Sequence, residues 1–331
     1  MKKEFKREAP IYVAVHVKDY IFFMLRKGAS LFSYKIGASE AAEIGTVSWD
    51  NRNKERLYEK IIYYKGKLFL IPFLAEYLTI YDIEKKEFSR LNIKNGDKDI
   101  FFTSAYICQN CVIILGSRVL VICENEDGYL IREIDDWLKP VSEYVFNDRD
   151  VYFRGQAIYQ NDKMLIPFRN ANALLELDIK NMQSKVHVLG KEALGYSGIT
   201  LMADGMYCLS PKATGSFCLV LDKSYRIVEK IELKSVSKPV TILGIGADNN
   251  KLIVYTSFTN EMHDKYIIKK ELLVECDREL ITFDLDNLSL CVSNKNVIVY
   301  NSPIFIKEQV ESLIRENKFF DIKDFLMCIE E

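Results

Sequence analysis

The stretch that decides the fold is residues 61–71, IIYYKGKLFLI. Two short apolar runs flank Lys65 and Gly66, and runs joined by a two-residue polar turn are typical of a β-hairpin. Glycine suits the turn because tight hairpin turns need positive φ angles. The stretch therefore predicts two antiparallel strands.

The same pattern returns along the chain at a regular interval. Strand-like residues flank six two-residue turns, at Lys18-Asp19, Lys65-Gly66, Gln109-Asn110, Asn161-Asp162, Asp204-Gly205 and Asn249-Asn250. Successive turns lie 43 to 52 residues apart. A third apolar run in several repeats ends at Asp82, Asp178, Asp222 or Asp284. We interpret these aspartates as turn-capping residues that accept hydrogen bonds from nearby backbone N–H groups.

Each repeat therefore reads as a four-stranded antiparallel meander, and six of them predict an all-β, six-bladed β-propeller. The chain resembles the β-propeller superfamily, with irregular kelch-like or quinoprotein-like blades, over about residues 10–300. The WD, kelch and sialidase signature motifs are missing from the sequence. Seven blades are the alternative, which would use the longer stretches 135–155 and 257–276. We interpret those stretches as insertions.

The last 30 residues have a different periodicity. Apolar residues take helical spacing in two groups, Ile306, Val310, Leu313 and Ile314, then Ile322, Phe325, Leu326 and Ile329. This spacing predicts two short amphipathic helices at 302–331, after a propeller domain at 1–301. The helices either dock on the propeller or form a homodimer contact or partner-binding handle.

Charge and hydropathy limit the classes of partner. The chain has 45 Lys+Arg against 47 Asp+Glu, a formal net charge of −2. This balance argues against a nucleic-acid partner or a polybasic membrane surface. No apolar run approaches the roughly 18 residues of a membrane span. We expect a soluble cytoplasmic protein.

The sharpest short motif is the pair Cys108 and Cys111. This spacing can supply half of a zinc site or a redox dithiol. We interpret the pair as structural, because it flanks a predicted hairpin turn and no second closely spaced Cys or His pair occurs. The other cysteines fall mostly in apolar strands, so we expect reduced thiols rather than a disulfide framework.

We assign no catalytic residue, no metal ligand and no cofactor from the sequence. The three histidines, His16, His187 and His263, are far apart in the chain. A three-histidine catalytic metal site would need all of them. Propeller active sites are assembled across blades, however, and leave no linear motif.

The loop-rich face is where we expect a binding site. In propellers the loops that enter each blade, and those between its second and third strands, open on one face. Trp, Tyr and Arg, the residues enriched at binding hot spots, occur in these predicted loops. The predicted ligand-binding residues are Trp49, Arg56, Trp137, Arg154, Arg169, Asn170, Tyr196 and Lys212.

Arg154 and Arg169 belong to one predicted blade and could together hold a carboxylate or phosphate. The alternative is that the tryptophans wedge between blades and the arginines are solvated. The sequence thus predicts a non-catalytic propeller that binds a protein or a small polar or anionic ligand. The alternative function is a propeller hydrolase, lyase or epimerase acting on a carbohydrate.

Overall fold

The structure is a computed structural model. It describes residues 11–25, 27–35, 41–97, 99–126, 128–146, 151–154, 157–160, 162–201, 205–211, 217–232, 240–248, 251–260, 265–267, 274–275, 280–284, 289–293 and 297–300. Several sequence predictions lie outside these residues: the helices at 302–331, Lys212, His263 and the turn after Asp284. The described residues divide into two compact units, one up to Arg132 and one within Glu133–Pro303, which are described separately.

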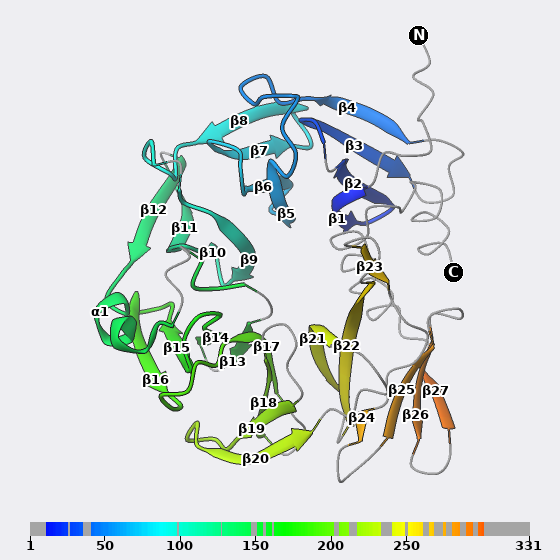
Figure 1. Cartoon of the computed structure of the whole chain (residues 1–331). Coiled ribbons are helices and arrows are strands. Elements are labelled where there is room, and N and C mark those ends of the chain that lie inside the picture. The colour runs from blue at the N-terminus through cyan, green and yellow to red at the C-terminus, as the bar shows by residue number, and fades with distance from the viewer. Residues whose placement is uncertain are drawn as a thin grey trace. The chain divides into compact units, whose positions relative to one another are not determined.

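The first unit contains three sheets, each a meander whose strand order follows the chain (Figure 1). The first sheet has β1 (Ile11–Val17), β2 (Tyr20–Leu25), β3 (Ser30–Lys35) and β4 (Ala42–Thr46). The second has β5 (Tyr58–Tyr64), β6 (Lys67–Pro72), β7 (Leu78–Asp82) and β8 (Glu87–Leu91). The third has β9 (Phe102–Cys108), β10 (Cys111–Gly116), β11 (Val119–Asn125) and β12 (Gly128–Ile134).

The second unit begins with the short helices α1 (Leu138–Val141) and η1 (Ser142–Tyr144), in the predicted insertion at 135–155. Two four-stranded sheets follow, β13 (Ile158–Gln160), β14 (Lys163–Pro167), β15 (Ala173–Asp178) and β16 (Gln183–Val188), then β17 (Tyr196–Leu201), β18 (Tyr207–Pro211), β19 (Phe217–Leu221) and β20 (Ile227–Glu232). The remaining strands are β21 (Val240–Asp248), β22 (Lys251–Asn260), β23 (Lys265–Ile267), β24 (Val274–Glu275), β25 (Leu280–Asp284), β26 (Ser289–Ser293) and β27 (Val297–Tyr300).

The predicted all-β class is confirmed, but a count of six blades is not. The described strands form seven sheets, of which β21–β23 has three strands and each of the others has four. The difference arises within 257–276, the second of the predicted insertions, where the described residues include strand residues. The end of β22 pairs there with β23, and β24 begins a separate sheet with β25–β27. The number of sheets matches the seven-bladed alternative.

Five of the six predicted hairpin turns have the backbone that the sequence requires, and the sixth, Asn249-Asn250, lies outside the described residues. Positive φ angles occur at Lys18 (55°), Lys65 (46°), Gln109 (53°), Asp162 (61°) and Gly205 (81°). Each of these residues connects the first and second strands of its sheet. The left-handed region therefore recurs where the two-residue turns were predicted.

The turn-capping role of the repeated aspartates is also confirmed. Asp82 Oδ1 accepts hydrogen bonds from the backbone N–H groups of Glu84 at 3.1 Å and Lys85 at 2.9 Å. Asp178 and Asp222 accept backbone N–H groups in the same way. Because such bonds favour the charged form, they hold the pKa values of Asp82 and Asp178 below the ordinary value.

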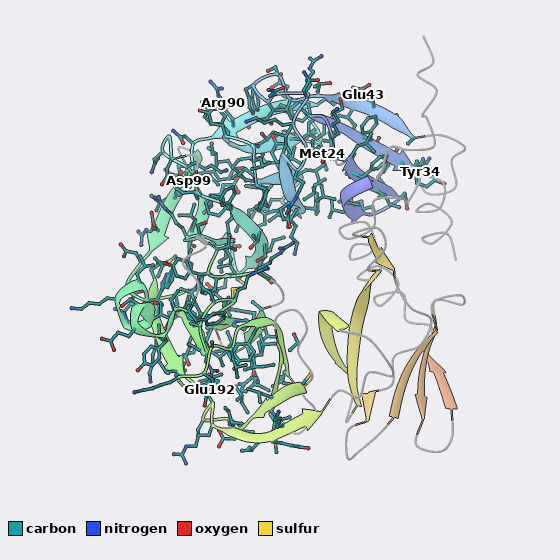
Figure 2. The ribbon with its side chains drawn as sticks, viewed as in Figure 1. Met24, Tyr34, Glu43, Arg90, Asp99 and Glu192 are labelled. Atoms are coloured by element: carbon teal, nitrogen blue, oxygen red, sulfur yellow. A yellow bond between two sulfur atoms is a disulfide. The ribbon has the colours of Figure 1, made fainter. Side chains whose placement is uncertain are left out.

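The three inner strands of the β5–β8 sheet, β5, β6 and β7, are buried on both faces, whereas the outer strand β8 is largely exposed. On β6, Leu68 and Leu70 pack against the β1–β4 sheet, in a cluster that contains Met24 (Figure 2). Phe69 and Ile71 point the other way and pack against the β9–β12 sheet. Successive residues of a strand alternate between faces, so a sheet covered on both sides needs an unbroken apolar run. This explains the continuous LFLI of the deciding stretch.

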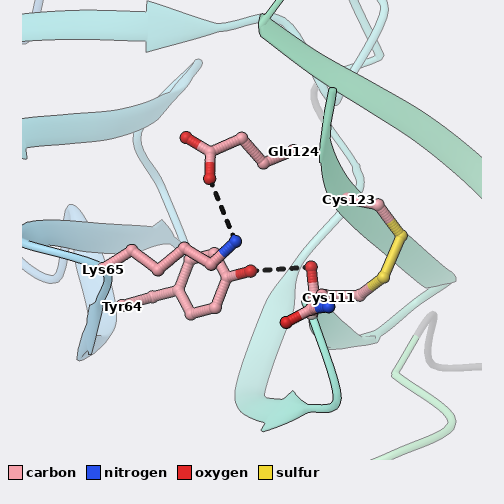
Figure 3. The surroundings of a disulfide bond; sticks show 6 residues. Tyr64, Lys65, Cys111, Cys123 and Glu124 are labelled. Atoms are coloured by element: carbon pink, nitrogen blue, oxygen red, sulfur yellow. Dashed lines mark hydrogen bonds and ion pairs between the residues drawn. A yellow bond between two sulfur atoms is a disulfide. The ribbon is translucent and has the colours of Figure 1, made fainter. Parts of the chain in front are cut away.

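Polar contacts join neighbouring sheets at the end where the first two strands turn. The Tyr64 hydroxyl donates to the backbone carbonyl of Asn110 at 2.7 Å (Figure 3). The ammonium groups of Lys65 and Lys67 contact the Glu124 carboxylate at 3.3 and 3.2 Å. These contacts link the β5–β6 turn to the β9–β12 sheet. In the described part of the chain, no helix is long and apolar enough to cross a membrane.

We predict that Phe69→Ala lowers the free energy of unfolding by about 3–5 kcal/mol, because it leaves a cavity at a side chain with 0% exposure. Chemical denaturation measures the loss. The matched control is Leu130→Ala at a side chain that is 43% exposed, where a change within about 0.5 kcal/mol is expected. Equal losses in the two variants would contradict this packing.

Candidate functional site

Three chain connections gather at the loop end of the β5–β8 sheet. They are residues 47–57 before β5, 73–77 between β6 and β7, and 92–101 after β8. In a four-stranded antiparallel meander, the entry, the second connection and the exit all lie at the same end of the sheet. The topology thus concentrates side chains from three separate segments.

A directional chain of hydrogen bonds crosses this end. The Tyr58 hydroxyl donates its only proton to Asp50 Oδ2. The Thr79 hydroxyl, 2.7 Å away, must therefore donate to the Tyr58 oxygen. Thr79 in turn accepts the Trp49 indole N–H at 3.1 Å. The chain runs from Trp49 through Thr79 and Tyr58 and ends on the Asp50 carboxyl.

Burial changes the pKa values of two residues in this hydrogen-bond chain, Asp50 and Tyr58. Burial raises the pKa of Asp50, although the hydrogen bond from Tyr58 opposes the rise. Burial also raises the pKa of Tyr58 well above its ordinary value, and the neighbouring Asp50 adds to the effect. Tyr58 therefore remains a hydrogen-bond donor throughout the physiological range.

Lys94 is the most unusual residue of the site, since its side chain is only 4% exposed. Its Nζ donates to the backbone carbonyl of Phe73 at 2.8 Å. Burial lowers the pKa of the Lys94 ammonium to about 8, against the attraction of the Asp50 carboxylate. We call Asp50, Tyr58, Phe73, Thr79 and Lys94 the Lys94 site.

A second repeat of the chain shows what this position needs structurally. Phe168 follows β14 as Phe73 follows β6, in the repeated sequence Ile-Pro-Phe. The carbonyl of Phe168 accepts the backbone N–H of Tyr196 at 2.8 Å. A neutral backbone donor therefore satisfies the equivalent carbonyl there. Lys94 places a buried charge where the fold elsewhere uses an amide, which points to a function for its amine.

Arginine and aromatic side chains surround the Lys94 site. The Arg56 guanidinium lies over the Phe73 ring at 4.2 Å, and it contacts the buried Glu59 carboxylate at 3.2 Å. The exposed Arg90 (Figure 2) lies over Tyr77 at 4.5 Å and over Trp49 at 5.5 Å. We call Arg90, Tyr77 and Trp49 the Arg90 layer. Its two rings are half-buried.

The arrangement offers two kinds of chemistry. A lysine with a pKa near 8 is partly neutral at physiological pH and can take or give a proton. The Arg90 layer presents a cation on aromatic rings, which is the composition of interaction hot spots. The residues at this end of the sheet could therefore support either proton transfer or binding of a partner.

Trp49 and Arg56 are the two sequence-predicted residues that lie at this site. The sequence analysis missed Asp50, Tyr58, Thr79 and Lys94. Asp50 and Lys94 resemble ordinary loop charges, and Tyr58 and Thr79 resemble ordinary strand residues. Their signal is burial and mutual contact, which follow only from the packed loops.

In the second unit, Trp137 and Tyr196 are each only 1% exposed. The Trp137 indole N–H donates to the Ile134 carbonyl at 2.7 Å, and its ring contacts Phe153 at 5.0 Å. The Tyr196 hydroxyl donates to Asn172. Both side chains are therefore packed inside the fold, and a ligand could not touch them without a rearrangement of the structure.

Arg154 and Arg169 lie on adjoining segments, since the Arg169 backbone N–H donates to the Tyr152 carbonyl at 2.7 Å. Both side chains are half-buried, whereas Asn170 is 3% exposed. A shared carboxylate or phosphate remains a prediction for the two arginines.

The expectation of reduced cysteines is wrong for one pair. Cys111 and Cys123 form a disulfide between β10 and β11 (Figure 3). The register of the two strands places them directly opposite each other, which the sequence pattern did not reveal. Cys108, Cys208 and Cys218 are buried free thiols, as expected. Among the described residues, no group of three or more His, Cys, Asp or Glu side chains could hold a metal ion.

A further titratable cluster lies in the second unit. The Glu176 carboxylate contacts Lys163 at 2.5 Å, His187 Nε2 at 3.1 Å and the Tyr225 hydroxyl at 3.1 Å. Burial lowers the pKa of His187, while the hydrogen bond to Glu176 opposes the shift. Tyr225 belongs to the next sheet's β19–β20 turn, so this cluster joins two sheets and we assign it a structural role.

We predict that the free energy of unfolding rises with pH because of Lys94. Between about pH 8 and 10.5 the unfolded chain holds the Lys94 proton and the folded chain does not. The linkage amounts to roughly 3 kcal/mol of added stability over that range. Urea denaturation of wild type and Lys94→Met at several pH values measures it.

The Lys94→Met variant should lose this part of the pH dependence, whereas Lys54→Met, at an exposed lysine of the same loop end, should retain it. Comparison with wild type at each pH cancels the titration of other groups. Parallel curves for wild type and Lys94→Met would show that the Lys94 pKa is not lowered.

The sequence matches no protein-family model, and no curated protein is significantly similar to it. Solved structures are similar in fold. An inactive variant of virginiamycin B lyase from Staphylococcus aureus, solved with quinupristin, has a TM-score of 0.55 at 14% identity, over 90% of this chain and 86% of that chain.

Two further structures agree over most of their length. U3-55K has a TM-score of 0.52 at 9% identity, over 89% of this chain and 81% of that chain. YCF48 bound to D1 peptide has a TM-score of 0.53 at 8% identity, over 84% and 78%. These structures are β-propellers. Together with the four-stranded antiparallel sheets, the similarity shows that this protein has a β-propeller fold.

Proposed function

We propose that the protein is a non-catalytic recognition propeller that binds a polypeptide partner through the Arg90 layer. The observation that carries the proposal is the stacking of the exposed Arg90 on Tyr77 and Trp49. Trp, Tyr and Arg are the residues that dominate binding energy in protein interfaces. A propeller solved with a bound peptide has a similar fold, which supports a polypeptide as the partner.

The layer is held in place before any partner arrives. The Trp49 indole donates to Thr79, which is fully buried in β7. Tyr77 and Leu74 belong to the β6–β7 loop, and backbone N–H groups of this loop bond to the Leu57 carbonyl. Rigid aromatic anchors lose little conformational entropy on binding, so this preorganisation favours affinity.

Selection from a phage-displayed random peptide library tests the proposal. We expect enriched peptides that bind wild type and bind Arg90→Ala at least about tenfold more weakly, a loss of about 1.4 kcal/mol. Arg90 is exposed, so the variant should fold normally. Arg132→Ala, at an exposed arginine of β12, is the matched control and should bind like wild type.

Peptides that bind Arg90→Ala and wild type equally would contradict a site at the Arg90 layer. Failure to enrich any sequence over an unrelated control protein would contradict polypeptide binding as a whole.

A second candidate function is proton abstraction from a carbohydrate carbon acid, as in a lyase or epimerase. The buried Lys94, with its pKa near 8, favours this candidate because a general base works best near the operating pH. Lyases are also among the proteins of similar fold.

Proton NMR in D2O, with uronate oligosaccharides as the probe, tests this second candidate. An active base exchanges the proton next to the carboxylate, at a rate that rises through about pH 8 and vanishes in Lys94→Met. The Lys54→Met variant should keep the activity. Absence of exchange in wild type, or equal exchange in Lys94→Met, would contradict proton abstraction by Lys94.

A further inference from the structure

Three cysteines form a row across the β9–β12 sheet. Cys111 on β10 lies directly opposite Cys123 on β11 and, on its other side, directly opposite Cys108 on β9. Directly opposite residues of antiparallel strands project to the same face of a sheet. All three sulfur-bearing side chains therefore share one face, with Cys111 in the middle.

The register explains which pair is oxidised. The Cα atoms of Cys111 and Cys123 are 4.3 Å apart, the spacing of a non-hydrogen-bonded pair. In an antiparallel sheet, Cys111 then directs its ladder hydrogen bonds towards Cys108. Such a hydrogen-bonded pair has a Cα spacing of about 5.5 Å, which is within the range that disulfides span. Cys111 thus has two partners that it can bond.

The other free thiols of the described residues lack this arrangement. Cys208 lies opposite Val220 in the register of β18 and β19. Cys218, on β19, lies opposite Ile231 of β20. Neither has a cysteine directly across from it in these pairings. The row of three is therefore a particular feature of the β9–β12 sheet.

We propose that Cys108, Cys111 and Cys123 form a thiol–disulfide exchange unit. The Cys108 thiolate attacks Cys111 Sγ, a Cys108–Cys111 bond forms and the Cys111–Cys123 bond breaks. Cys123 leaves as a thiolate and takes up the proton that Cys108 released. One disulfide and one thiol are present before and after, so the step needs no oxidant or reductant.

Exchange moves the free thiol from a buried position to a more accessible one. Cys108 is 3% exposed, whereas Cys123 is half-buried and precedes the exposed Glu124 (Figure 3). The released Cys123 becomes a modification site for thiol-reactive small molecules, including low-molecular-weight disulfides. Burial raises the pKa of the Cys108 thiol to about 11, so few molecules carry the attacking thiolate at neutral pH.

Trapping with N-ethylmaleimide tests the exchange in the full chain. The protein is incubated without added thiol at about pH 7, 8 and 9, quenched with acid, digested with trypsin and analysed without reduction. The starting state joins peptides 99–118 and 119–132 through their disulfide. The exchanged state gives peptide 99–118 with an internal disulfide and peptide 119–132 labelled on Cys123.

We expect labelled Cys123 to accumulate about tenfold faster for each pH unit, following the Cys108 thiolate fraction. Cys108→Ser should abolish this labelling, and Cys208→Ser should leave it unchanged. Cys108→Ala provides a second variant in case serine disturbs the buried position.

Three results would overturn the proposal. The first is a joined pair of peptides that persists at every pH without labelled Cys123. The second is equal labelling of Cys123 in wild type and both Cys108 variants. The third is a protein that carries no Cys111–Cys123 bond at the start.

Discussion

The burial of strands β5, β6 and β7 on both faces is the constraint on which the rest depends. Leu68 and Leu70 cover one face of β6, and Phe69 and Ile71 cover the other. Neither face can hold unpaired polar groups without a large desolvation cost. Charged side chains consequently lie near the ends of these inner strands and on the exposed outer strand β8. At the turn end, charged side chains join neighbouring sheets. At the loop end, they form part of the Lys94 site.

The repetition of the fold helps to separate function from packing. Phe73 and Phe168 each follow an Ile-Pro pair at the end of the second strand of a sheet, yet the Lys94 ammonium binds the first carbonyl and a backbone amide binds the second. Burying an ammonium is costly even when it is hydrogen-bonded, and a neutral donor meets the same structural need. In a repeat protein, a residue that lowers stability and differs from its counterpart in another repeat is a strong indication of function. In a protein without repeats, an unusual residue has no such counterpart for comparison.

The sequence predicted the local structure well because local structure depends on short patterns. The hairpin turn at Lys65 and the cap at Asp82 are each contained within a few residues. The sheet count was harder, since the β22–β23 pairing has no strong turn motif in the sequence. The disulfide was missed because it depends on the register that brings Cys111 opposite Cys123.

The candidate site was predicted only in part for a similar reason. Loop position identified Trp49 and Arg56, which lie at the Lys94 site. Loop position could not show that Trp137 would be buried by Phe153 and other rings. Nor could it show that Lys94 would fold inward to the Phe73 carbonyl. Such placements come from contacts between segments that are distant in the chain.

The contacts at the turn end also set an order for folding during synthesis. Tyr64 bonds to a residue 46 positions further on, and the Tyr207 and Tyr225 hydroxyls bond to residues 47 and 49 positions earlier. Each interval is close to one repeat. During synthesis, an apolar sheet face therefore stays uncovered only until the next repeat has left the ribosome and its sheet can pack against that face. The length of the repeat limits how long a nascent sheet is open to aggregation.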